Sequence, residues 1–244
     1  MLVFKTTYKP FGNKAILIEW PQEISEEILQ DILSFKNKIQ LHYTGFYDIT
    51  TAYNSLTIYL NSIIINFDNE IISLNKIYSY NVEKTKYKKN FTWHIPACYH
   101  SDLAPDLESF LELKNLTLSK LIDLHSRTIY TVYFLGFLPG FPYLGGLSNQ
   151  LHLKRKTAPD LNIKKGAIGI GGQQTGVYTV DSPGGWHIIA KTPINFFDIN
   201  KEPPCFIKAG DKIIFDPISK STYNSIAKQI LNDTYKIKKQ NLYV

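Results

Sequence analysis

Two adjacent cations stand out as groups that could bind an anion. Arg155 and Lys156 lie in the segment LHLKRKTAP, and such side chains can hold a carboxylate or a phosphate. A solvated basic turn would give the same pattern, so spacing alone leaves both interpretations open. Gln173 follows a pair of glycines and could orient an amide or a carbonyl, although a polar turn would also explain it. These residue types suit an anionic ligand with an amide or carbonyl group.

His125 is a further candidate for chemistry. It ends a predicted amphipathic helix over 117–125, just before a predicted strand, so it could act as a general acid or base or bind a ligand. A helix-terminal histidine held by packing is an equal alternative. Asp181 and Asp198 lie in turn sequences that are common in proteins, and we predict neither to be catalytic. The six histidines show no HExxH motif and no paired ligand spacing, which argues against a metal site.

Three segments dense in glycine surround these candidates. They are GFLPGFPYLGGL over 136–147, GAIGIGGQQTGVY over 166–178 and DSPGGWHIIAKTP over 181–193. Glycine lets a ligand approach the backbone closely, and loops rich in glycine and proline can leave N–H groups free to bind anions. Glycines that only shape tight corners are the alternative. Three such segments close together nevertheless favour a binding site.

The glycine segments match none of the familiar nucleotide or nucleophile motifs. GIGGQQTG lacks the GxGxxG spacing and is followed by a predicted strand instead of a helix. The chain contains no GxxxxGK[ST] phosphate loop and no GxSxG nucleophile elbow. A dinucleotide-binding or P-loop domain is therefore not predicted.

The composition is that of an ordinary globular protein, with 44% hydrophobic and 20% charged residues. The formal charge is +6, but the lysines are scattered and no recognition motif accompanies them, so we do not expect nucleic-acid binding. No apolar run is long enough to span a membrane. Cys98 and Cys205 form no CxxC pair and no export signal is recognisable, so we expect reduced thiols in a cytoplasmic protein.

The order of predicted elements indicates two domains of an α+β protein. Residues 1–84 read β-β-α-β-β-α, which indicates a small N-terminal α+β sandwich. A charged connector over 84–90 precedes the second domain, residues 90–244, where short strands alternate with glycine and proline in a manner typical of a barrel or sandwich. The strands predicted there are 91–96, 128–134, 167–170, 176–180, 186–191 and 212–216, with helices at 105–114 and 117–125.

A dense, ordered series of motifs runs from Ile95 through Phe215: FLGFLPGFPYLGGL, LHLKRK, IGIGGQQTGVY, SPGGWHIIAKTP and AGDKIIF. In these motifs the chain resembles the KipI / 5-oxoprolinase B-subunit family, long labelled allophanate hydrolase subunit 1. The resemblance implies an N-terminal α+β domain and a C-terminal cyclophilin-like β-barrel. It also implies an ATP-dependent 5-oxoprolinase that opens the lactam of 5-oxo-L-proline to L-glutamate. This chain would work only with a C subunit of related fold and an A subunit, and magnesium is expected with the ATP.

The resemblance also implies a set of site residues. Phosphorylation of the lactam oxygen would create a leaving group, so the site must hold a carboxylate, orient an amide and stabilise phosphoryl charge. We expect catalytic roles for His125, Arg155 and Gln173. The residues expected by matching position to bind substrate or ATP are Lys156, Phe137, Pro139, Gly140, Phe141, Tyr143, Gly171, Gly172, Thr175, Gly176, Tyr178, Pro183, Gly184, Gly185, Trp186 and Thr192.

Four positions depart from the family pattern. Lys156 and Asp160 stand where arginines are usual, and Asp160 reverses the sign of the charge, which weakens the expectation of an anion site there. Lys164 or Lys165 could supply the charge instead. The other departures are His100 for an acid and Ala190 for a glycine.

Two other functions compete with the enzyme subunit. Some relatives of this family inhibit a sensor histidine kinase, so a pure interaction protein is the first alternative. Such an inhibitor needs a complementary surface but no convergence of Arg155, Lys156 and Gln173. Urea or allophanate metabolism, suggested by the old family label, is a weaker third interpretation, because a fold does not fix a function.

Overall fold

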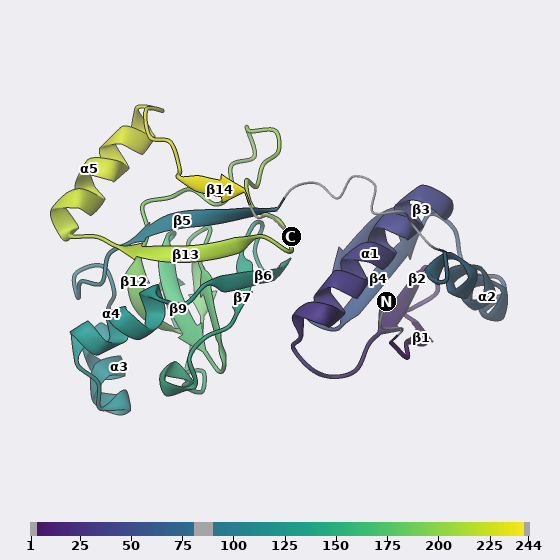
Figure 1. Ribbon diagram of the computed structural model, residues 1–244, viewed down its shortest axis with the longest axis horizontal. Helices are drawn as coiled ribbons and strands as arrows, with labels where there is room; N and C mark the ends of the chain where they lie inside the picture. Colours follow the sequence, from purple (N-terminus) through teal and green to yellow (C-terminus); the bar gives the residue numbers. More distant parts are fainter. Residues whose placement is uncertain (1–3, 81–89, 242–244) are drawn as a thin grey trace. The chain divides into compact units, whose positions relative to one another are not determined.

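The structure is a computed structural model that describes residues 4–80 and 90–241. The chain divides into two compact units, Met1–Lys88 and Lys89–Val244 (Figure 1). Of the predicted connector over 84–90, all but the last residue lies outside the described residues. No helix in the described part of the chain is both long and apolar enough to cross a membrane.

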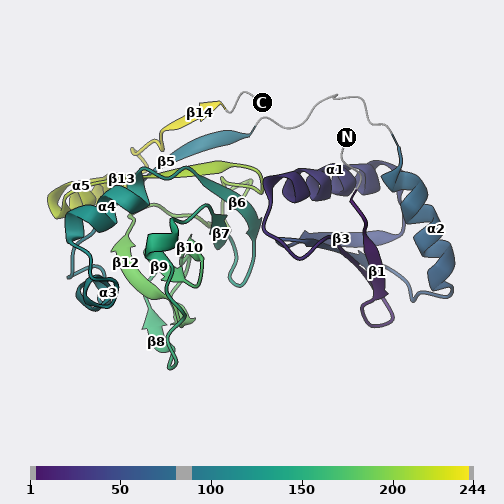
Figure 2. The ribbon, with the colours of Figure 1, turned by 60° about the horizontal axis from the view of Figure 1, so that its bottom comes forward.

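Unit 1 is an antiparallel sheet covered by two helices. The sheet has the order β1-β2-β4-β3, and α1 lies along one of its faces (Figure 2). The alternation in SLTIYL buries Leu56, Ile58 and Leu60 on that face, where they share a core with α1 and α2. The elements are β1 (Thr7–Pro10), β2 (Ala15–Glu19), α1 (Glu26–His42), β3 (Phe46–Thr51), β4 (Ser55–Leu60) and α2 (Phe67–Tyr78).

Unit 2 is built on an eight-stranded sheet in the order β12-β9-β10-β7-β6-β13-β5-β14. Its strands are β5 (Phe91–Ala97), β6 (Tyr130–Leu135), β7 (Pro142–Gly145), β9 (Ala167–Gly171), β10 (Gln174–Val177), β12 (His187–Lys191), β13 (Lys212–Pro217) and β14 (Lys239–Asn241). A separate pair is formed by β8 (Asp160–Ile163) and β11 (Ser182–Gly184). The helices are α3 (Leu107–Lys114), α4 (Leu118–Ser126), α5 (Lys220–Leu231) and the 3-10 turn Asn149–Leu151.

The sheet of unit 2 is open, which corrects the expectation of a closed barrel. Across the described residues β12 and β14 are the two edge strands. Cys98, just beyond β5, forms an isolated antiparallel bridge with Lys191 at the end of β12. Alternation and glycine spacing predict strands and local hairpins. Whether distant strands pair along their length depends on twist and curvature, which those patterns do not specify.

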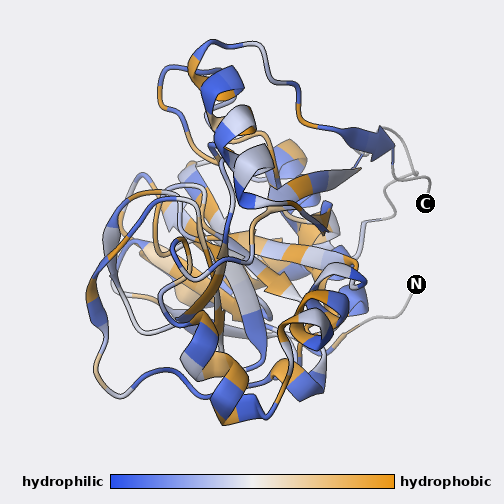
Figure 3. Ribbon diagram, turned by 90° about the vertical axis from the view of Figure 1, so that its left-hand side faces the viewer, coloured by the Kyte–Doolittle hydropathy of each residue, from blue (hydrophilic) through white to orange (hydrophobic). Residues whose placement is uncertain are grey.

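The core of unit 2 lies between the strands and the helices. Figure 3 shows hydrophobic residues in orange concentrated on the central strands of unit 2, with blue hydrophilic residues on its outer loops and helices. α3 packs against β12 and α4 against β13. Tyr130, Phe141 and Phe215 are among the largest fully buried side chains of this core. The sheet thus positions most of the candidate residues, which lie on its strands and on the loops between them.

A buried carboxylate joins the strands β5, β6 and β13 where β5 and β13 begin. Asp211 is fully buried and accepts hydrogen bonds from the Phe91 N–H (3.0 Å), the Trp93 indole N–H (2.9 Å) and the Lys208 N–H (3.1 Å). Its backbone carbonyl accepts from the Val132 N–H at 2.9 Å. Since a buried carboxylate is stable only when its oxygens are satisfied, Asp211 links β5, β6 and the turn before β13.

Candidate functional site

Arg155 lies on an aromatic surface. Its guanidinium carbon is 5.8 Å from the centre of the Trp186 ring, within the range of a cation–π contact. The Trp186 ring in turn meets Phe141 and Tyr143 edge to face, with centroid distances of 5.4 and 6.0 Å. Burial raises the pKa of Tyr178 to about 12, and the positive charge of Arg155 partly opposes this rise. Arg155 itself is exposed and has no ion-pair partner among the described residues.

The backbone on both sides of Arg155 is fixed to the glycine segments. Leu153 and Gly172 exchange two backbone hydrogen bonds, of 3.1 and 2.7 Å. On the other side, the Lys156 N–H donates to the carbonyl of Gly185 at 2.8 Å. Arg155 is therefore held between the β9–β10 turn and the residue that precedes Trp186. This places a cation in a defined position before any ligand binds, which is what an anion site requires.

An aromatic cluster extends from Trp186 to an exposed phenylalanine. Phe137 has φ of 66°, a conformation that is uncommon for a bulky residue, and its ring is 63% exposed. It meets Phe141 edge to face at 5.6 Å. The loop is tied down where the Thr179 hydroxyl donates to the carbonyl of Pro139 at 2.7 Å. A strained and exposed aromatic side chain on a fixed loop is typical of a ligand or partner contact.

Lys156 does not join Arg155 as a second free cation, contrary to our expectation. Its ammonium lies 2.6 Å from a carboxylate oxygen of Asp106 and 2.5 Å from one of Asp160. Burial alone would lower the pKa of Lys156, but the hydrogen bonds to both carboxylates raise it above its usual value. The second oxygen of Asp106 accepts from the Ile188 N–H at 2.7 Å. Lys156 therefore links the start of α3 to β8, and Asp106 links it to β12.

Asp106 was absent from the residues predicted from the sequence. It lies at the N-cap position of α3, fifty residues before its partner Lys156. An acidic residue at the start of a helix is common, so the only available signal indicated a helix start. The contact with Lys156 depends on the packing of α3 against β12 and has no local pattern.

His125 belongs to the core in this structure. Its side chain is fully buried, with Nδ1 at 2.7 Å from the Tyr99 hydroxyl and Nε2 at 3.2 Å from the Thr175 hydroxyl. Its ring stacks on Phe215 with a centroid distance of 4.8 Å. Of the two sequence interpretations, the surroundings match the histidine held by packing. His125 and Thr175 lie together beneath the sheet, and neither is exposed beside Arg155.

The buried imidazole should make stability depend on pH. Burial lowers the pKa of His125 from 6.5 to about 3. Between these values the unfolded chain binds a proton that the folded chain does not, so the free energy of unfolding should decrease as the pH falls. The slope contributed by one such group approaches about 1.4 kcal/mol per pH unit. Denaturant unfolding of wild type and His125→Gln over this range should show a smaller slope in the variant, and equal slopes would contradict the assignment.

Three of the six glycines predicted to bind a ligand instead make room for aromatic rings. A Cβ on Gly171 would lie 2.5 Å from the Trp186 ring, and one on Gly184 would lie 2.2 Å from the Tyr178 hydroxyl. Gly176 is covered in the same way by Phe141. Gly172 has φ of +68° and no atom within 4 Å of a Cβ, and a Cβ on Gly185 would also meet no close atom. Close packing thus explains much of the glycine pattern.

Replacing Gly171 by alanine should displace the Trp186 ring from its place under Arg155. The added methyl group overlaps the ring, so we expect a loss of about 1–3 kcal/mol in the free energy of unfolding, as for other overpacked cores. Gly185→Ala is the matched control, because its Cβ would meet no atom closer than 3.6 Å. Thermal unfolding and tryptophan fluorescence of both variants test this. Equal losses of stability in the two variants would show that overlap with the Trp186 ring is not the cause.

The remaining predicted residues are divided between surface and core. Gln173 is exposed in the β9–β10 turn next to Gly172, and its amide makes no hydrogen bond within 4–80 and 90–241. Thr192 is buried, and its hydroxyl accepts from the Ile194 N–H at 3.2 Å. Pro139 is an exposed loop residue, and Pro183 is exposed on β11. Gly140 is buried with a positive φ of 74°, and a Cβ there would lie 2.7 Å from the Cys205 sulfur.

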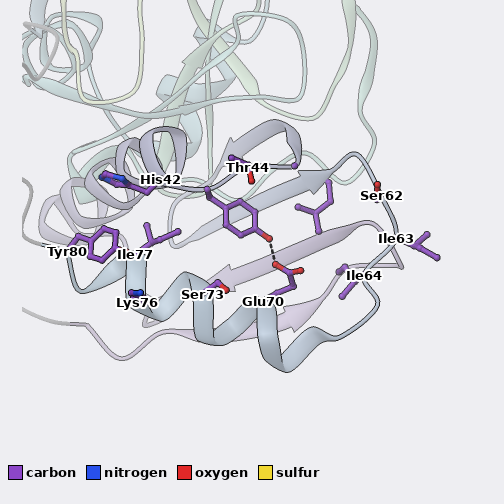
Figure 4. A pocket seen from close by; sticks show the side chains of 13 residues that line it. His42, Thr44, Ser62, Ile63, Ile64, Glu70, Ser73, Lys76, Ile77 and Tyr80 are labelled. Atoms are coloured by element: carbon purple, nitrogen blue, oxygen red, sulfur yellow. Dashed lines mark hydrogen bonds between the residues drawn. The ribbon is translucent and has the colours of Figure 1, made fainter.

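A separate cavity of about 500 Å³ lies within unit 1. Figure 4 shows it between the end of α1, the segment after β4 and one side of α2, with the Tyr43 hydroxyl donating to Glu70. Burial, followed by the contact with Glu70, raises the pKa of Tyr43. None of the residues predicted from the sequence lines this cavity. Elsewhere, the described residues contain no group of three or more His, Cys, Asp or Glu side chains that could hold a metal ion.

Comparison with known proteins places this arrangement in a family. Residues 6–207 match the family model for the carboxyltransferase domain, subdomain C and D. The B subunit of the Bacillus subtilis 5-oxoprolinase is 33% identical over 228 residues, which cover 89% of this chain and 95% of that protein. The chain belongs to the 5-oxoprolinase B-subunit family. The resemblance inferred from the ordered motifs is thereby confirmed.

Further members of the 5-oxoprolinase B-subunit family and its structural relatives agree with this placement. The B subunit of the Haemophilus influenzae 5-oxoprolinase is 31% identical, over 84% of this chain and 95% of that protein. The urea amidolyase of Kluyveromyces lactis shares the fold, with a TM-score of 0.80 over 98% of this chain and 16% of that one, at 19% identity. The names of these relatives give no support to a histidine-kinase inhibitor.

Proposed function

We propose that this chain is the B subunit of an ATP-dependent 5-oxoprolinase, which converts 5-oxo-L-proline to L-glutamate in the cytoplasm. The names and coverage of the bacterial relatives support the assignment. The observation that carries it for this chain is Arg155, an exposed cation without an ion-pair partner among the described residues, held over Trp186. The partners in this proposal are an A subunit and a C subunit of cyclophilin-like fold, related to unit 2, with magnesium accompanying the ATP.

The substrate has two features that the Arg155 surface can recognise. 5-Oxo-L-proline carries one carboxylate and a small lactam ring. A guanidinium presents a planar fork of donors that matches a carboxylate, and such charge-assisted hydrogen bonds are among the strongest in proteins. The buried Trp186 ring and the half-buried Tyr143 ring form an apolar cluster next to that cation. Gln173, free on the neighbouring turn, is the side chain suited to the lactam amide.

The side chains around Arg155 do not include a suitable base for the hydrolysis, which supports an activity that requires partner chains. Ring opening adds water across the amide, so the C–N bond breaks, the carbon gains a hydroxyl and the nitrogen gains a proton. Burial raises the pKa of Tyr143 and of Tyr178, which makes both poor bases near neutral pH. Asp160 is paired with Lys156, and His125 is enclosed in the core. The base for water is therefore expected from another chain of the complex.

Glutamate release from 5-oxo-L-proline tests the proposal. The chain is co-expressed with the candidate A and C subunits from the same genome, and release is measured with and without ATP. Release that requires ATP and stops when this chain is omitted is the expected result. A folded, assembled complex that releases no glutamate with ATP present would refute the proposed function.

A further inference from the structure

The charges around Arg155 compensate one another almost completely. Lys156 lies between the carboxylates of Asp106 and Asp160, at 2.6 and 2.5 Å. Together with Arg155 these are two cations and two anions, so the net charge of the group is zero. Arg155 lowers and Asp160 raises the pKa of Tyr178, whose rise is caused mainly by burial. Among these four side chains, Arg155 is therefore the cation that has no carboxylate partner.

The lysine best placed by sequence to restore a second cation is also paired. Lys164 lies 2.9 Å from one carboxylate oxygen of Asp181. The other oxygen of Asp181 accepts from the backbone N–H of Lys165 at 2.8 Å. The sequence suggested that Lys164 or Lys165 could replace the arginine that is usual at position 160. The structure instead pairs the Lys164 ammonium with Asp181 and binds the Lys165 backbone to the same carboxylate, while the exposed Lys165 ammonium has no ion-pair partner among the described residues.

The glycine backbone does not supply a phosphate cradle either. The Gly172 N–H already donates to the carbonyl of Leu153 at 2.7 Å. Gly171 lies under the Trp186 ring, and Gly184 lies against the Tyr178 hydroxyl. Phosphate sites in nucleotide-binding proteins use several free N–H groups, cations or a metal ion together. The described residues around Arg155 thus do not fit the triphosphate of ATP with its magnesium.

We infer that the Arg155 surface binds the single carboxylate of a small lactam acid, and that the phosphates of ATP bind on another chain of the complex. A monoanion needs one guanidinium, whereas a polyphosphate would meet a group in which the charges of Arg155 and Lys156 are balanced by those of Asp106 and Asp160. The identity of the acid, 5-oxo-L-proline, rests on the proposed function. The inference that the lactam acid binds this chain and the ATP phosphates bind another rests on the charges around Arg155.

Titration of the full chain by NMR, observing the tryptophan indole N–H signals, separates the two ligands. The signal of Trp186 is identified by its loss in Trp186→Phe. We expect 5-oxo-L-proline to shift this signal saturably in wild type and not in Arg155→Ala. Mg-ATP and inorganic tripolyphosphate should leave it unchanged over the same concentrations. A saturable shift by either polyphosphate, or no shift by 5-oxo-L-proline, would overturn the inference.

Asp160→Arg provides the gain-of-function comparison. The exchange removes one anion, adds one cation and frees Lys156 from one of its two partners. We expect tripolyphosphate to bind this variant at least about 10-fold more tightly than wild type. Unchanged weak binding by the folded variant would show that charge compensation is not what excludes phosphate, and so would count against the inference. These binding results are independent of glutamate release, so failure of the inference and failure of the proposed function are distinguishable.

Discussion

Replacing Arg155 by alanine should lower kcat/KM of the assembled complex for 5-oxo-L-proline by about 10- to 100-fold, the loss expected for hydrogen bonds between a charged donor and a carboxylate. The reason is that Arg155 is the exposed cation on the aromatic surface, held in place by backbone bonds on either side. The side chain is exposed, so the free energy of unfolding should change by less than about 0.5 kcal/mol. Steady-state kinetics and thermal unfolding measure the two effects.

Two further variants sharpen the test of Arg155. Lys154→Ala removes an exposed cation one residue away and should leave kcat/KM close to that of wild type. Arg155→Lys keeps the charge but loses the planar fork, so its activity should lie between wild type and Arg155→Ala. If Arg155→Ala kept near wild-type activity in a complex of normal composition, Arg155 would not be a substrate-binding residue.

Replacing Asp211 by alanine should have the largest effect on stability. The substitution would leave the buried Trp93 indole N–H and the partly buried Phe91 and Lys208 N–H groups without their acceptor. An unsatisfied buried donor costs about 1–3 kcal/mol, and the three together should lower the free energy of unfolding of unit 2 by about 3–5 kcal/mol. Urea unfolding followed by tryptophan fluorescence measures this loss.

Asp181→Ala is the matched control for Asp211. Asp181 also accepts from a backbone N–H and pairs with a lysine, but it lies on the surface, where water can replace those contacts. Its removal should change the free energy of unfolding by no more than about 1 kcal/mol. Similar midpoints for both variants would show that burial of Asp211 contributes little to stability.

Local structure in unit 2 was largely predictable where short-range rules apply. The helix predicted over 117–125 corresponds to α4, and the Thr117 hydroxyl caps its start by accepting from the Lys120 N–H at 3.2 Å. The strand predicted over 212–216 corresponds to β13. The strand predicted over 176–180 is displaced, because the hairpin turn lies at Gly172 and Gln173 and β10 begins at Gln174. α5 and β14 were not predicted, since their patterns are weakly apolar.

The sequence by itself determined the type of surface that carries the site. It indicated the family, the glycine-rich loops, the aromatic side chains and an arginine among them, because motifs and periodicity are properties of neighbouring residues. It also marked Asp160 as a departure that would weaken an anion site.

Only the tertiary structure decided which of these groups are free to act. It brought Asp106 to Lys156 across fifty residues, enclosed His125 beside Tyr99, and placed Trp186 over Gly171. Compensation of charge, loss of hydration and close packing all arise between segments that are distant in the chain. Spacing along the chain therefore predicted the candidates, and packing in space selected Arg155 from among them.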